Sequence, residues 1–142
     1  MTDGALITVL LPVRAPAPWL ETALASVRSQ TMRDWEVLGV VDGPDEEVEG
    51  VLEAFGARMV RIDRSEGLPH ALNIGLEAVR SPLVARMDAD DVSWPERLER
   101  QAHEMLRRPD LAVLGTRVRE VDGLGNAIGV RVAPTGTRLR RE

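Results

Sequence analysis

Three carboxylates within four residues are the part of this sequence best suited to chemistry. Asp88, Asp90 and Asp91 follow a short apolar run, 83–87, and precede a Pro-led segment with helical spacing. Carboxylates this close repel one another, so such a cluster persists mainly where a cation neutralises it or where the loop is fully solvated. Mg²⁺ and Mn²⁺ take one or two carboxylates and complete their shells with phosphate oxygens and water. The pattern therefore indicates either a divalent-metal site that also holds a phosphate or an acidic surface turn.

The elements that must position this cluster alternate between short apolar runs and segments with helical spacing. Buried strands are expected at 6–13, 37–41, 59–62, 83–87, 112–121 and 128–132, the last two joined by a Gly-rich turn. Helices are expected to begin near Pro18, Pro69 and Pro95, and a further helix to run through 48–55. Four strand–helix repeats in succession predict an α/β fold with an open, mostly parallel sheet and right-handed crossovers.

Polar signals follow three of the predicted strands. Arg14 follows the first strand directly after Pro12 and Val13, Asp42 ends the second, and the acidic cluster ends the fourth. Ligands of open parallel sheets bind beyond the carboxyl ends of the strands. The sequence therefore predicts one crevice at this edge, which favours a site over a surface turn.

Composition excludes several classes of protein. The 142 residues suffice for one domain with a real core, and the net charge of −5 argues against broad attraction to nucleic acid. The absence of Cys rules out a disulfide framework and thiolate metal sites, and all 18 basic residues are Arg. No apolar run is long enough to span a bilayer, so a cytoplasmic protein without a transmembrane segment is expected.

Three blocks of the sequence resemble a known family. They are ITVLLPVRA, LETALASVRSQTMRDWEVLGVVDG and GLPHALNIGLEAVRSPLVARMDADDVSWPERLERQ. The chain is similar to the N-terminal, nucleotide-sugar-binding portion of a family 2 glycosyltransferase over roughly residues 5–122. The resemblance implies the Rossmann-like GT-A fold, with helices flanking the sheet. It implies a nucleotide-diphosphosugar-binding domain over 1–133, followed at 134–142 by a polar tail or a truncated connection.

The resemblance implies a role for each residue of the predicted crevice. Asp42 would accept a hydrogen bond from the base, usually uracil, because uracil offers an N–H donor. Asp88 and Ala89 would lie near the ribose, and Asp90, with Asp88 and Asp91, would hold a Mn²⁺ or Mg²⁺ ion bridging the diphosphate. Contacts with the nucleotide sugar are also implied for the backbone of Pro12, Val13 and Gly67. Arg14 departs from the family, which often has an aromatic residue at this point, and could either meet a phosphate or be an exposed structural Arg. The chain departs from the family at Val41 and Pro44, where an Asp and a Ser are usual, so base and sugar stay open.

The C-terminal, acceptor-binding half of the family pattern is missing from this chain. In the family that half supplies the Asp or Glu that deprotonates the acceptor, so the catalytic base is expected beyond residue 142 and no residue here is assigned that role. The resemblance implies inverting transfer from a nucleoside diphosphate sugar, a UDP-sugar, to a hydroxyl of a glycan or lipid-linked acceptor in surface glycan synthesis. Partners could hold the protein at the inner face of the membrane, and a homo-oligomer stays open.

Two alternative functions remain. A non-catalytic nucleotide-sugar-binding or interaction domain would explain the missing half. A haloacid-dehalogenase-like phosphatase would explain the loop 88–92, which fits its Asp-x-Asp-x-[Thr/Val] pattern, but the chain lacks Lys and has little sequence after the loop. A calcium loop is disfavoured because Ser93 stands where its Gly is obligatory.

Two arginines of the predicted last helix, Arg97 and Arg100, are interpreted as a solvated face. Their expected partners are Glu96 and Glu104, at spacings that place opposite charges near one another on a helix.

Overall fold

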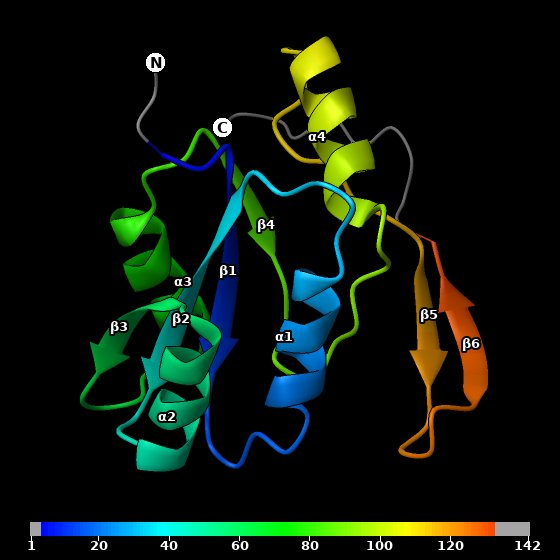
Figure 1. Cartoon of the computed structure of the whole chain (residues 1–142). Helices are drawn as coiled ribbons and strands as arrows, with labels where there is room; N and C mark the ends of the chain where they lie inside the picture. Colours follow the sequence, from blue (N-terminus) through cyan, green and yellow to red (C-terminus); the bar gives the residue numbers. More distant parts are fainter. Residues whose placement is uncertain (1–3, 133–142) are drawn as a thin grey trace. The chain divides into compact units, whose positions relative to one another are not determined.

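Four parallel strands form the centre of the structure, a computed structural model that describes residues 4–132. They are β1 (Ile7–Val13), β2 (Trp35–Asp42), β3 (Arg58–Ile62) and β4 (Leu83–Arg86), in the order β3-β2-β1-β4 (Figure 1). β1 pairs with β2 in the register Ile7↔Trp35 and with β4 in the register Ile7↔Leu83. The first four predicted strands and their parallel arrangement are therefore confirmed. The chain separates into two compact units, Met1–Glu104 and Met105–Glu142, and the four-stranded sheet belongs to the first.

Helices connect the strands and cover both faces of the sheet. They are α1 (Leu20–Arg28), α2 (Glu46–Phe55), α3 (Leu68–Ala78) and α4 (Arg97–Arg107). α2 shows how local sequence sets its ends: the Asp45 side chain accepts a hydrogen bond from Val48 N at 2.9 Å, and Gly56 ends the helix at φ 87°. Both are favoured terminal residues, since Asp pairs an otherwise free N–H and Gly adopts the left-handed conformation readily. No helix in the described part of the chain combines the length and apolarity needed to cross a membrane.

The core has two layers because side chains of a strand alternate between the faces of the sheet. In β1, Val9 and Leu11 pack with α1, α2 and the start of α4, whereas Leu10 packs with α3 on the opposite face. Gly75 of α3 allows that second contact to be close. A β carbon at this position would lie 2.5 Å from Leu10 Cδ1 and 2.8 Å from Val40 Cγ2.

The second unit contains an antiparallel hairpin of β5 (Val118–Val121) and β6 (Ala127–Arg131). The prediction of one strand over 112–121 is wrong in its first half, because only Val118–Val121 has a partner strand with which to form ladder hydrogen bonds. The Gly-rich turn is confirmed, with Gly125 N donating to Asp122 O at 2.9 Å. The predicted tail at 134–142 lies outside the described residues.

Candidate functional site

The polar residues predicted to act together lie at one edge of the sheet. β1, β2, β3 and β4 are all parallel, so their carboxyl ends meet at the same edge, and β1 lies between β2 and β4 (Figure 1). Asp42 is the last residue of β2, and the acidic loop 88–91 follows β4 by way of Met87. Two strand spacings separate these ends, about 10 Å. A nucleoside diphosphate can bridge such a separation.

Asp42 is buried, and its two carboxylate oxygens differ in their surroundings. Asp42 is 7% exposed. Ser65 Oγ donates a hydrogen bond to Oδ2 at 2.7 Å, whereas Oδ1 is buried with no hydrogen-bond partner. Buried polar atoms are nearly always paired, and an unpaired carboxylate oxygen lowers stability. Such an atom at the carboxyl edge of a sheet is a candidate acceptor for a ligand N–H.

The acidic loop places Asp88 between a cation and two further carboxylates. Arg86, the last residue of β4, forms an ion pair with Asp88 Oδ1, and Asp91 N donates to Asp88 O at 3.2 Å. Burial raises the pKa of the Asp88 carboxyl, as do Asp91 and Asp90, while the charge of Arg86 and its hydrogen bond oppose the rise. Asp90 and Asp91 are exposed. The three carboxylates therefore oppose one another's charge on one short loop, and a bound cation would relieve that repulsion.

Arg97 belongs to this region, and its predicted place on a solvated helix face is wrong. Its Nη2 donates to Arg86 O at 2.8 Å and its Nε donates to Gln101 Oε1 at 3.0 Å. Burial lowers the pKa of Arg97, and the negative charge of Asp91 acts in the opposite direction. Arg97 thus holds the backbone from which the acidic loop departs.

The remaining predicted residues differ in accessibility. Pro12 and Val13 are buried at the end of β1, while Arg14 is exposed just beyond it. Gly67 precedes α3 with φ 96° and ψ 170°, a conformation that L side chains rarely adopt, and Pro69 Cδ at 3.9 Å is the near neighbour of a β carbon built there. The backbone at Gly67 is therefore open to a close approach by a ligand.

The predicted metal ligands supply suitable atoms without forming a preassembled cage. Carboxylate oxygens match Mg²⁺ and Mn²⁺, which need only one or two protein ligands when phosphate oxygens and water complete the shell. Among residues 4–132, no group of three or more Asp, Glu or His side chains is arranged to hold a metal ion. The donor chemistry of Asp88, Asp90 and Asp91 fits such an ion, and its binding stays a prediction.

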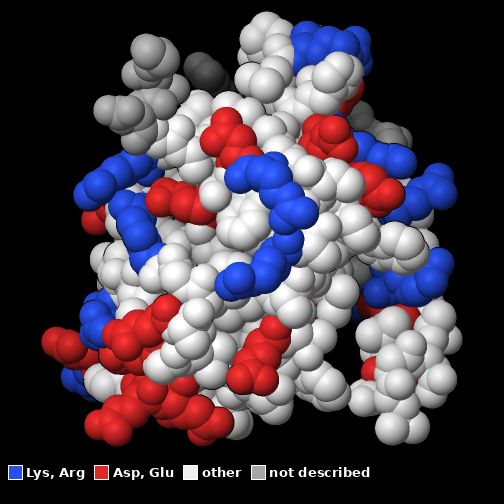
Figure 2. All heavy atoms as spheres, in the orientation of Figure 1, with Lys and Arg blue, Asp and Glu red and all other residues white. Residues whose placement is uncertain are grey.

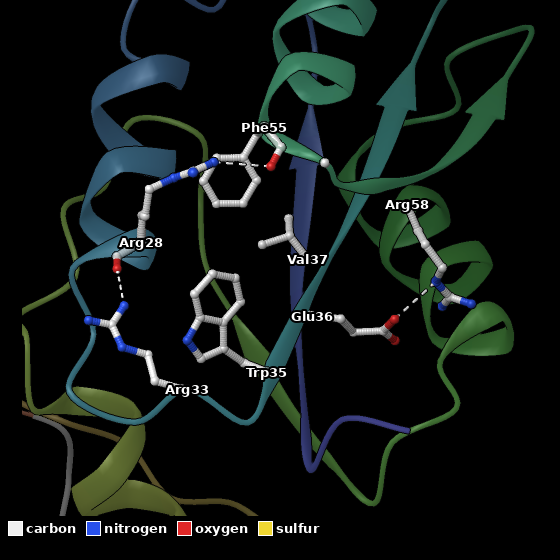
Figure 3. Close-up of a pocket in the computed structure, with 8 residues that line it drawn as sticks. Arg28, Arg33, Trp35, Glu36, Val37, Phe55 and Arg58 are labelled. Atoms are coloured by element: carbon white, nitrogen blue, oxygen red, sulfur yellow. Dashed lines mark hydrogen bonds and ion pairs between the residues drawn. The ribbon is translucent and has the colours of Figure 1, made fainter. Parts of the chain in front are cut away.

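A separate pocket lies at the opposite edge, where β2 and β3 begin. It has a volume of about 360 Å³, and its lining includes Arg28, Trp35, Phe55 and Arg58 (Figure 3). Arg28 Nη2 donates to Phe55 O at 3.1 Å and stacks on the Phe55 ring at 4.5 Å, and Arg33 Nη1 donates to Arg28 O at 2.8 Å. Each arginine thus pairs a carbonyl oxygen at the C-terminal end of a helix, a structural role.

Charged side chains form local clusters on the visible face of the first unit. Acidic side chains gather over the start of α2 and basic ones over the end of α1 (Figure 2). Glu46, Glu47 and Glu49 occupy the first turn of α2, where the helix dipole favours negative charge.

Several residues of this region have no motif that could identify them. Ser65 contacts Asp42 across 23 positions, and Gln30 contacts Trp94 across 64. Each is a common polar residue whose role depends on a partner distant in sequence. The amphipathic spacing of α1 predicts which of its apolar residues are buried, but it does not identify polar residues that bind a distant segment.

Comparison with known proteins relates the chain to glycosyltransferases. It is 38% identical over 114 residues to the amylovoran biosynthesis glycosyltransferase AmsE of Erwinia amylovora, covering 75% of this chain and 42% of that protein. It is 30% identical over 141 residues to the O-antigen biosynthesis glycosyltransferase WbnJ of Escherichia coli, covering 96% and 55% respectively. The chain thus spans about half the length of these relatives.

Solved structures support the fold. The mannosyltransferase PcManGT of Pyrobaculum calidifontis, in complex with GDP-Man and Mn²⁺, matches with a TM-score of 0.63 and 24% identity over 84% of this chain and 36% of that chain. TarS 1-349 of S. aureus, in complex with UDP, matches with a TM-score of 0.67 and 19% identity, covering 72% and 32% respectively. At these identities the likeness concerns the GT-A fold alone, which confirms the predicted fold class.

The family itself follows from the sequence match. The description "Glycosyl transferase family 2" matches residues 8–140, which include all the predicted site residues. This match gives no support to the phosphatase alternative. The chain therefore belongs to glycosyl transferase family 2.

Proposed function

We propose that this chain binds a nucleoside diphosphate sugar, with uracil as the base, through Asp42 and the loop 88–91. The observation that carries the proposal is the unpaired, buried Oδ1 of Asp42 at the carboxyl end of β2. Only β1 separates β2 from β4, which allows one ligand to contact both Asp42 and the acidic loop. Family membership and the GT-A neighbours support a nucleotide sugar as that ligand.

The surroundings of Asp42 favour uracil over guanine. Ser65 already donates to Oδ2, so Oδ1 is the oxygen left to accept a hydrogen bond. Uracil presents a single N–H donor at N3, whereas guanine presents two adjacent donors that match both oxygens of a carboxylate. Because Oδ1 is covered, binding requires the carboxyl group or the loop carrying Ser65 to move. The structural neighbours include a GDP-Man complex and a UDP complex, so this preference is a specific claim about the present chain.

The acidic loop would hold a divalent ion, Mn²⁺ or Mg²⁺, together with the diphosphate. Asp90, with Asp88 and Asp91, offers hard oxygen ligands, and exposed Asp90 and Asp91 are accessible to a metal–nucleotide complex. When bound, the ion stabilises negative charge on the departing diphosphate. The ion pair with Arg86 engages Oδ1 of Asp88, so this carboxylate would offer its Oδ2 to the ion.

The reaction proposed for the whole protein is inverting transfer of the sugar to a hydroxyl of a glycan or lipid-linked acceptor. The two relatives named for amylovoran and O-antigen biosynthesis support glycan synthesis as the setting. The chain covers about half of those relatives, so the acceptor site and its base are not assigned to any residue described here.

The test is calorimetric titration of UDP into the chain with Mn²⁺ and with EDTA. We expect UDP binding that depends on Mn²⁺ and that is lost in Asp90→Ala, because this variant lacks a proposed metal ligand. Asp90 is exposed, so its side chain can be removed without disturbing the core. Glu47→Ala, an equal loss of charge on the exposed start of α2, should bind as the wild type does. Absence of UDP binding by the folded wild-type chain would refute the proposal. Sugar release from a UDP-sugar onto an added acceptor would separate transfer from binding alone.

A further inference from the structure

The acidic loop is attached to the rest of the first unit at both of its ends. It connects β4, which ends at Arg86, to α4, which begins at Arg97. At the first end, Met87 is 2% exposed and its N donates to Leu10 O at 3.1 Å, which extends the pairing with β1. The acidic residues therefore leave the sheet from a fixed point.

Gln30 holds the second end, although it lies far away in the sequence. This residue follows α1 and is 0% exposed. Its Nε2 donates to Trp94 O at 2.7 Å and lies 3.2 Å from Ser93 Oγ, while its Oε1 accepts from Leu98 N at 3.0 Å. The N–H groups of a first helical turn have no partner within the helix. Gln30 therefore supplies the missing partner at the buried start of α4 and fixes the backbone that precedes it.

Ser26 adds a second attachment one turn earlier on α1. Ser93 N donates to Ser26 Oγ at 2.9 Å, and Ser26 Oγ itself donates to Ala23 O at 2.6 Å. Both Ser26 and Ser93 are buried, so the bond between them is shielded from water. Pro95 O also accepts a hydrogen bond from Thr31 N at 2.8 Å. The segment after the acidic residues is thus tied along the last turn of α1 and the residues that follow it.

These attachments act on a loop whose charges oppose a compact arrangement. Asp88, Asp90 and Asp91 repel one another, and the loop contributes one turn bond of its own, Asp91 N to Asp88 O. Fixing both ends of a short loop removes most of its alternative conformations before a ligand arrives. Ligand sites are effective when neighbouring residues hold the liganding side chains in place.

We propose that Gln30 and Ser26 are positioning residues that preorganise the loop 88–91 for the divalent ion and the diphosphate. This inference rests on the proposed function, in which that loop binds the metal–nucleotide complex. The two residues act through the backbone of Ser93 and Trp94 and contact no ligand themselves. Their removal should therefore raise the Mn²⁺ requirement of UDP binding.

Ser26→Ala is the discriminating variant, since Ala is favourable inside a helix and only the Oγ hydrogen bonds are lost. Ser29→Ala is its matched control: the same substitution at the end of the same helix removes a hydroxyl that donates to Ser26 O at 2.8 Å and touches no part of the loop. Gln30→Leu removes the larger attachment. For each chain, the Mn²⁺ concentration giving half-maximal UDP binding is measured by calorimetry, and amide hydrogen exchange is followed in peptides covering the loop and β1.

The expected result is an increase of about tenfold in the half-maximal Mn²⁺ concentration for Ser26→Ala and Gln30→Leu, with faster exchange in the loop but not in β1. Ser29→Ala should match the wild type in both measurements. An unchanged Mn²⁺ requirement or unchanged loop exchange in a folded Ser26→Ala chain would overturn the inference while leaving the proposed function intact. A folded wild-type chain that binds no UDP would overturn the proposed function, and the role of Gln30 and Ser26 with it. A global loss of structure in Gln30→Leu leaves the decision to Ser26→Ala.

Discussion

Asp42→Asn should make the free protein more stable and its UDP binding weaker. Asp42 carries a carboxylate that is 7% exposed, with one oxygen bonded to Ser65 and the other unpaired. Leaving a buried acceptor unpaired costs about 1–3 kcal/mol, and more when the acceptor is charged, so a neutral amide of the same shape reduces that penalty. The Asn amide can donate a hydrogen bond to Ser65 Oγ, so the contact is retained with donor and acceptor exchanged. We therefore expect an increase of about 1 kcal/mol in the free energy of unfolding.

The effect of the same substitution on binding has the opposite sign. A hydrogen bond to a charged group contributes about 1.5–3 kcal/mol, and one between neutral groups about 0.5–1.5 kcal/mol. The middles of these ranges differ by about 1.2 kcal/mol, which corresponds to a UDP dissociation constant roughly eightfold higher for Asp42→Asn. Asp42→Ala removes the acceptor entirely and should weaken binding further.

Urea unfolding and UDP calorimetry on the same preparations measure both effects. Asp45→Asn is the control, because Asp and Asn are equally good at the start of a helix and Asp45 only pairs Val48 N. It should leave both stability and UDP affinity close to the wild-type values. A fall in the free energy of unfolding of Asp42→Asn would contradict an unpaired Oδ1, because it would mean that the wild-type carboxylate stabilises the fold. Unchanged UDP affinity would refute base recognition by Asp42.

Two further predictions concern packing and titration. Gly75→Val should lower the free energy of unfolding, measured by urea unfolding, by about 2 kcal/mol, because a β carbon would lie 2.5 Å from Leu10 Cδ1. In the control Gly50→Ala the added β carbon meets nothing within 4 Å, and the free energy of unfolding should rise by about 0.5 kcal/mol. Unchanged stability in Gly75→Val would contradict the close packing of α3. Hydrogen bonds from Asn126 lower the pKa of Asp122, so the hairpin should gain stability above the ordinary pKa of Asp and lose it as pH falls through the lowered value. An NMR titration should show a higher pKa for Asp122 in Asn126→Ala than in the wild type. An unchanged pKa would contradict Asn126 as the cause of the shift.

The sheet could be predicted from the sequence because its two central strands, β1 and β2, are largely buried on both faces. A parallel strand in this position has apolar residues throughout, and β1 is such a run, with every residue from Ile7 to Val13 buried. The carboxylates at the strand ends followed from the same reasoning, since parallel strands deliver their carboxyl ends to one edge. The fifth strand was misjudged because 112–117 carries apolar residues that pair with no strand.

The contacts that complete the candidate site could not be predicted in this way. Ser65, Gln30 and Ser26 are ordinary polar residues, and only the folded chain brings them to Asp42 and to the segment after the acidic loop. The sequence predicts a solvent-facing Arg97 because charged residues on an amphipathic helix usually face water. Its guanidinium instead bonds to Arg86 O, a partner that becomes adjacent only when α4 returns past the end of β4.

The strand order also has a consequence for how the chain folds. β2 pairs with one side of β1, where Ile7 lies opposite Trp35. β4 pairs with the other side, where the same Ile7 lies opposite Leu83, a residue much farther along the sequence. Contacts distant in sequence form later, because a longer segment of chain must be ordered to close them. We expect β1, β2 and β3 to assemble with Asp42 already in place, and β4 to dock afterwards. During folding, the edge of the sheet that carries Asp42 would then form before the acidic loop 88–91 takes its place beside it.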